Sequence, residues 1–116
     1  MGALEEILPD EIRQNAILSG SEYVLALRDA QRAIEIASER LIAILGVESF
    51  RILAAGLAVM DYTGYNFELR GDWAEFVRLN NTEALTFLRD HQLPDGHGYI
   101  LTATSEEEFH ALAEVP

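Results

Sequence analysis

Two residue types are missing from this chain of 116 residues: it has no cysteine and no lysine. Without cysteine there are no disulfides, thiolate nucleophiles or cysteine-ligated zinc sites, a composition typical of proteins in reducing compartments. Without lysine there is no Schiff-base chemistry and no P-loop lysine to bind phosphate. The two absences together remove several classes of enzyme from consideration.

Long apolar runs are also missing. The longest, residues 52–60, is interrupted by Gly56 and is about half of the roughly 20 residues that cross a bilayer. The first residues carry Glu5 and Glu6, whereas a signal peptide begins with basic residues. We therefore expect a cytoplasmic protein with no membrane span and no membrane partner.

Basic residues are scarce, with 8 Lys and Arg against 20 Asp and Glu, which gives a formal net charge of −12. A field of this sign repels phosphate backbones, so we expect no nucleic-acid binding. Two interpretations of the acidity stay open. The carboxylates could attract a basic protein partner, or they could serve only to keep a small protein soluble.

Prolines are few, and no repeat or low-complexity tract divides the sequence. A chain with 49% hydrophobic residues and 3 prolines has the composition of one globular domain. At this length a single core is large enough to be stable without disulfides or metals. We predict one α+β domain that spans residues 1–116.

Helical spacing of apolar residues is clearest over Asp29–Leu45. Apolar side chains recur there at steps of three and four, which predicts one long amphipathic helix. Asp29 is expected to cap the start of this helix, and Gly46 to follow its end. Shorter helices are predicted over Leu8–Ser19, after the cap Asp72, from Asn81 or Thr82 to Leu93, and after a Ser105–Glu108 capping box.

Alternating, β-branched and aromatic residues predict strands elsewhere. Residues 50–69 are expected to form three short antiparallel strands, and Tyr99–Ala103 one more. Because strands gather in the middle of the chain and helices flank them, the fold class is α+β. We predict a small antiparallel sheet of about three or four strands, with one long and several short helices on one face.

The first candidate site lies around the Thr63-Gly64 turn, where Asp61, Tyr62 and Tyr65 are expected to be exposed at a sheet edge. Tyrosine is common at binding hot spots because its large rigid surface also carries a hydrogen-bonding group. A role in the hydrophobic core is the other interpretation of this aromatic group, and its members Phe67 and Trp73 are expected in the core.

The second candidate site is a pocket formed by His91, Asp95 and His97. Their spacing matches no known metal motif, and Asp and Gly in this segment are also what a turn requires. We therefore predict no metal site, no cofactor and no catalytic residue for the chain.

Size and charge together suggest a small acidic, non-enzymatic interaction protein, such as an inhibitor or immunity-type binder of a basic partner. The alternative is a domain that self-associates, binding a small molecule or acting as an accessory subunit of unknown activity. The first hypothesis requires a protein partner of basic character, and the second requires a second copy of the chain.

Overall fold

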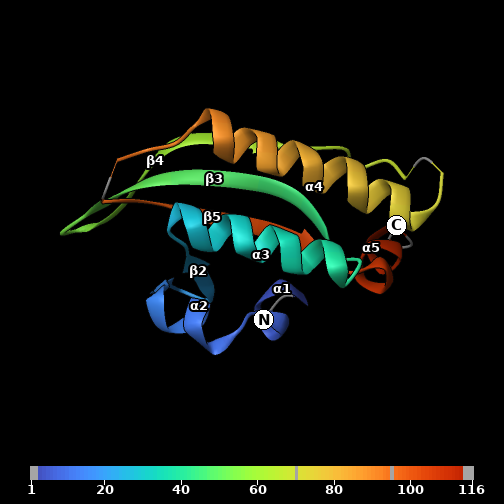
Figure 1. The fold of residues 1–116 in the computed structure, drawn as a ribbon, viewed down its shortest axis with the longest axis horizontal. Helices are drawn as coiled ribbons and strands as arrows, with labels where there is room; N and C mark the ends of the chain where they lie inside the picture. The colour runs from blue at the N-terminus through green and yellow to red at the C-terminus, as the bar shows by residue number, and fades with distance from the viewer. Residues whose placement is uncertain (1–2, 70, 95, 114–116) are drawn as a thin grey trace.

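The computed structural model describes residues 3–69, 71–94 and 96–113, which form an α+β domain as predicted (Figure 1). The helices are α1 (Ala3–Ile7), α2 (Asp10–Asn15), α3 (Leu27–Glu39), α4 (Trp73–Asp90) and α5 (Glu106–Ala113). The strands are β1 (Ile17–Ser19), β2 (Glu22–Val24), β3 (Ala43–Leu53), β4 (Gly56–Gly64) and β5 (His97–Thr104).

A three-stranded antiparallel sheet in the order β4-β3-β5 forms the centre of the fold. Strands β1 and β2 form a separate hairpin, which joins the sheet where Leu25 and Tyr99 exchange two backbone hydrogen bonds of 2.8 Å. Helices α3 and α4 lie side by side across one face of the sheet (Figure 1). Of the two faces of the sheet, one is covered by helices and the other carries none of the helices that the structure describes.

The main core fills the space between these two helices and the sheet. Helix α3 contributes Ala30, Ala33, Ile34 and Ala37, which recur at helical spacing and so point to one side. Helix α4 and strands β3 and β5 complete the core with Ala84, Phe87, Leu88, Ile44, Val47, Tyr99 and Leu101. These small and branched side chains explain why α3 packs closely on the sheet.

The prediction of one helix over Asp29–Leu45 was wrong beyond Glu39, because α3 ends there and β3 begins at Ala43. Leu41 between them has a φ of 55°, a left-handed conformation that ends a helix. The amide of Asn81 then holds the chain as it enters the sheet. It accepts a 2.8 Å hydrogen bond from Ile44 N and donates a 3.0 Å one to Ile42 O.

Both predicted ends of that helix were also wrong. Residue Ala26, rather than Asp29, occupies the N-cap of α3, and no side chain caps it. Gly46 does not follow the helix but lies within β3, opposite Gly64 of β4 and Thr102 of β5. Because Gly46 has no side chain, the side chain of Tyr62 can lie over it.

Residues 50–69 contain the end of β3 and the whole of β4 rather than three short strands, and residues 65–69 lie outside the strands. Strands β3 and β4 make one hairpin around Ala54 and Ala55. Helix α4 is one helix of 18 residues, without the predicted break at Asn81. That residue and Asn80 are buried, so their side chains bond to other elements instead of competing for the helix backbone.

Two predicted caps are confirmed. Asp72 accepts a 2.8 Å hydrogen bond from Glu75 N at the start of α4. Ser105 and Glu108 form a reciprocal capping box before α5, with Glu108 N donating to Ser105 Oγ at 3.2 Å. The predicted helix over Leu8–Ser19 is instead the short helix α2 followed by β1, with Pro9 at the N-cap of α2.

Replacing Asn81 with Ala should lower the free energy of unfolding by about 3 kcal/mol, because two buried backbone groups would lose their partner. Urea denaturation measures the change. Thr86→Ala is the matched control on the exposed side of α4 and should change stability by less than about 0.5 kcal/mol. A loss below about 1 kcal/mol for Asn81→Ala would show that the amide does not hold this connection.

Candidate interaction surface

The sheet face opposite α3 and α4, here called the open face, follows from the strand register. Glu48 stands opposite Tyr62 and Ile100, and Phe50 stands opposite Val59. Residues directly opposite one another share a face. The open face therefore carries Glu48, Phe50 and Ile52 of β3, Leu57, Val59 and Tyr62 of β4, and Ile100 of β5.

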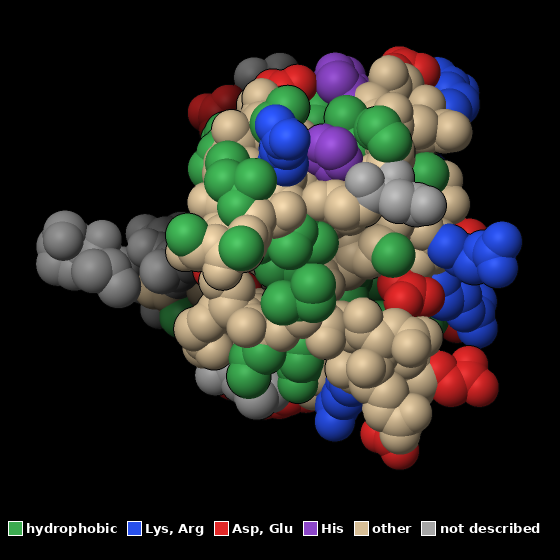
Figure 2. All heavy atoms as spheres, turned by 90° about the vertical axis from the view of Figure 1, so that its left-hand side faces the viewer, with side chains coloured by type: hydrophobic (Ala, Val, Ile, Leu, Met, Phe, Trp, Pro, Cys, Tyr) green, Lys and Arg blue, Asp and Glu red, His purple; other side chains and the backbone are tan. Residues whose placement is uncertain are grey.

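Only part of the open face is covered. Val24 of β2 packs on Phe50 and Ile100, which are buried. Beyond this cover, Val59 is 61% exposed and Tyr62 is 56% exposed. Figure 2 views the molecule from the end where β3 turns into β4, and several hydrophobic side chains are exposed at this end. Exposed apolar side chains that gather on one surface mark interaction sites.

Tyr62 and Phe67 form an aromatic platform over a floor of two glycines. A Cβ atom on Gly46 would lie 3.3 Å from Tyr62 Oη, and one on Gly64 would lie 3.5 Å from Tyr62 Oη and 3.6 Å from a Phe67 ring carbon. The tyrosine side chain therefore lies along the sheet surface. Phe67, which follows β4, is 60% exposed, so both rings are accessible.

Glu48 is the acidic residue of the open face. It lies on the central strand and is partly buried between its cross-strand neighbours Tyr62 and Ile100. Among the residues that the structure describes, no hydrogen-bond or ion-pair partner of Glu48 is found. An acid that is partly removed from water loses solvation, and no described residue replaces it with a hydrogen bond or a cation.

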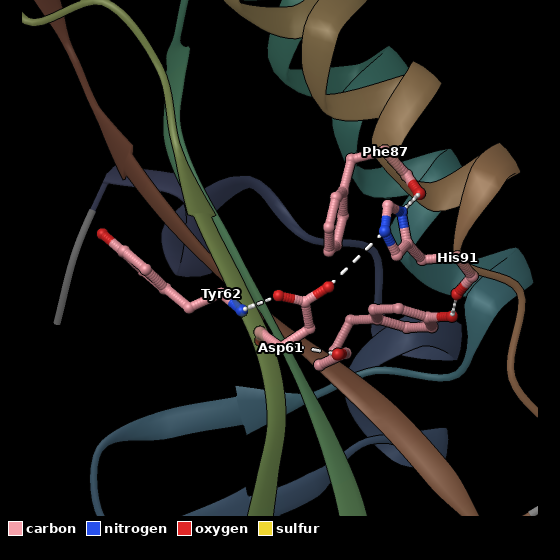
Figure 3. Close-up of polar contacts among 6 residues, drawn as sticks. Asp61, Tyr62, Phe87 and His91 are labelled. Atoms are coloured by element: carbon pink, nitrogen blue, oxygen red, sulfur yellow. Dashed lines mark hydrogen bonds and ion pairs between the residues drawn. The ribbon is translucent and has the colours of Figure 1, made fainter.

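Asp61 points to the other side of β4, toward the end of α4 (Figure 3). Its Oδ1 accepts a 2.8 Å hydrogen bond from Tyr62 N, and its Oδ2 lies 3.4 Å from His91 Nε2. His91 is fixed by ring stacking on Phe87, with centroids 4.1 Å apart, and by a 3.0 Å hydrogen bond from Nδ1 to the Phe87 carbonyl. Asp61 thus bonds to the backbone of β4 and lies beside the His91 ring at the end of α4.

The hydrogen bond between Asp61 and Tyr62 N makes the outer edge of β4 less available for pairing with another strand. In the three-stranded sheet β4 is an edge strand, and exposed edges pair readily with other chains. Met60 is the extra residue where the β3–β4 register shifts, so it interrupts the strand as a bulge. The carboxylate of Asp61 accepts a hydrogen bond from the N–H of the next residue, Tyr62, so this N–H is already paired. Both features oppose the addition of another strand.

Replacing Asp61 with Ala should therefore promote self-association through β4, raising the dimerisation constant about tenfold. Analytical ultracentrifugation measures this constant. Asp90→Ala removes the same charge from the exposed end of α4 and should leave the constant unchanged. Equal behaviour of the two variants would show that Asp61 contributes only its charge.

Tyr65, the third residue of the first candidate site, lies apart from Asp61 and Tyr62. It packs against the main core, and its hydroxyl is buried without a partner among the described residues. Burial, with a smaller contribution from the charge of Glu83, raises the pKa of this phenol well above its usual value of 10.0. The structure thus places Tyr65 in a packing role.

The raised pKa of Tyr65 predicts a loss of stability at high pH. The folded chain keeps this phenol protonated while the unfolded chain ionises it, so the unfolding free energy falls as pH rises through 10. Tyr99 contributes to the same fall, because burial also raises the pKa of its phenol. Tyr65→Phe should reduce this fall and, because it removes an unpaired buried hydroxyl, raise stability at pH 7 by about 1 kcal/mol.

Tyr99→Phe is the matched control, because the Tyr99 hydroxyl donates a 2.6 Å hydrogen bond to His91 O. This variant should lose about 1 kcal/mol at pH 7. Denaturation of both variants between pH 7 and 11 tests the pair. An equal loss at pH 7 in both would mean that the Tyr65 hydroxyl has a partner after all.

Two residues of the second candidate pocket, His91 and His97, have different partners. His91 faces Asp61, whereas His97 bonds through Nδ1 to Pro94 O at 2.9 Å. Asp95 lies outside the described residues. His97 borders a cleft of about 550 Å³ between the start of α3 and the segment that precedes β5. Within the described ranges, no three His, Asp or Glu side chains gather to hold a metal ion.

No protein-family model, curated protein or solved structure matches this chain. Among the described helices, none is both long enough and apolar enough to cross a membrane. Sequence reasoning selected Tyr62 but did not select Val59 or Glu48. It was wrong to place Phe67 in the core, because this side chain is 60% exposed. Residues 57–60 are all apolar, so the sequence carries no alternation that shows which of them face the helices, and only the strand register assigns the two faces.

Proposed function

We propose that this chain is a non-enzymatic protein-binding module whose open face binds a partner protein of basic character. The observation that carries the proposal is the exposure of Val59, Tyr62 and Phe67 beside a sheet face that no helix covers. Covering these side chains would remove apolar surface from water, which is the main favourable term in protein association. The aromatic side chains would serve as anchors of the interface.

The charge of the chain supports a basic partner. A formal net charge of −12 would attract a cationic protein from a distance and accelerate its encounter with the open face. It also opposes the approach of another acidic protein. A small acidic inhibitor of a basic enzyme would combine these two features, a field that steers the partner and an apolar surface that retains it.

A second copy of the chain is the competing occupant, and the open face is poorly suited to it. Two copies packed face to face would enclose two Glu48 carboxylates, and the strand residues described on the open face include no arginine to neutralise them. Burying unpaired charge of this kind costs several kcal/mol per ion. The guarded edge of β4 likewise opposes dimerisation by strand pairing.

Site-directed photocrosslinking in the source cells tests the proposal. The photoreactive residue p-benzoylphenylalanine replaces Val59 on the open face, or Arg32 on the exposed side of α3 as the control. We expect an adduct with a basic protein from position 59 and none from position 32. The captured protein is then purified and its affinity for the chain is measured by calorimetry.

Val59→Asp should weaken that affinity at least tenfold, because it places a charge in the apolar contact. Thr86→Asp adds the same charge on the helix side, at another exposed position, and should change the affinity less than twofold. The affinity should also fall as salt rises. Adducts between copies of the chain alone, together with a stable dimer in solution, would overturn the proposal in favour of self-association.

A further inference from the structure

We infer that the aromatic platform and Glu48 together form a site for an arginine side chain of the partner. This inference rests on the proposed function, because it names the group that the partner would place on the open face. Its components are the rings of Tyr62 and Phe67, the glycine floor of Gly46 and Gly64, and the carboxylate of Glu48.

The glycines make room for the site. Gly46 and Gly64 are opposite one another in the β3–β4 pair, and neither has a side chain that would lift the tyrosine ring off the sheet. The contacts of Tyr62 with both positions therefore show a ring that lies along the surface. A ring in this position offers a face to solvent, and a cation is attracted to such a face by its quadrupole.

Glu48 supplies the opposite charge at the right place. It is two residues after Gly46 on β3 and directly opposite Tyr62, so its carboxylate shares the face on which the rings lie. A group bound there could contact the Tyr62 ring and the Glu48 oxygens together. Since no described residue of the chain pairs with Glu48, a cation from outside would satisfy it.

Arginine fits these components better than lysine does. Its guanidinium is planar, stacks on aromatic rings, and donates two parallel hydrogen bonds to a carboxylate. It is also more weakly hydrated than an ammonium group, so it enters a partly apolar site more readily. The chain's own Arg51 does not take this role, because its odd offset from Glu48 along β3 places it toward the other face.

NMR titration of the whole chain with N-acetyl-L-arginine N-methylamide tests the site. Its neutral citrulline analogue has the same shape without the charge and serves as the ligand control. We expect the arginine amide to shift backbone and ring signals of Glu48, Tyr62 and Phe67 in a saturable manner. The citrulline amide should bind at least tenfold more weakly, and the lysine amide should fall between the two.

Glu48→Gln should weaken arginine-amide binding at least tenfold while leaving the spectrum of the fold intact. Glu39→Gln removes the same charge at the exposed end of α3 and should leave binding within twofold of the parent chain. Shifts spread over many acidic residues, or equal effects of the two substitutions, would show attraction by net charge alone and overturn the inference.

The two proposals fail in different ways. If position 59 still yields a specific partner adduct but Glu48→Gln leaves both that partner's affinity and arginine-amide binding unchanged, the open face binds a partner without this site. If the arginine amide binds at Glu48 but position 59 captures no other protein, the site stands and the proposed protein partner does not.

Discussion

The side-chain amide of Asn81 is the interaction on which the rest of the structure depends. It belongs to α4, yet it bonds to the backbone of residues 42 and 44 and to Ser38 Oγ, and so it joins the end of α3, the start of β3 and the middle of α4. By fixing where β3 begins, it also fixes which side chains of β3 face the helices. A shift of one residue would exchange the two faces and place Val47 in solvent.

Local signals in the sequence predicted the features that local chemistry decides. The caps at Asp72 and Ser105 form as expected because each involves residues three positions apart. The helix predicted over Asp29–Leu45 failed because Ile42, Ile44 and Leu45 suit a buried strand as well as a helix. The choice between these structures depends on Asn81, 37 residues farther along the chain than Ile44, and a local pattern contains no information about that contact.

The environments of the candidate site residues also could not be predicted from local sequence. Asp61, Tyr62 and Tyr65 are close in sequence but serve three different environments: the α4 side of the sheet, the open face and the main core. Alternation along β4 separates the first two, and the third lies just beyond the strand. Glu48 could not be associated with Tyr62 from the sequence, since their proximity is a property of the register, which the bulge at Met60 also adjusts.

Gly98 determines how much of the open face remains accessible. A Cβ atom at this position would lie 2.5 Å from Val24 Cγ1, far inside van der Waals contact, so the β1–β2 hairpin can rest on β5 only because residue 98 has no side chain. The hairpin in turn shields Phe50 and Ile100. This single glycine thus determines how much of the open face the β1–β2 hairpin covers. An alanine at position 98 would push the hairpin away from β5 and expose more of the open face.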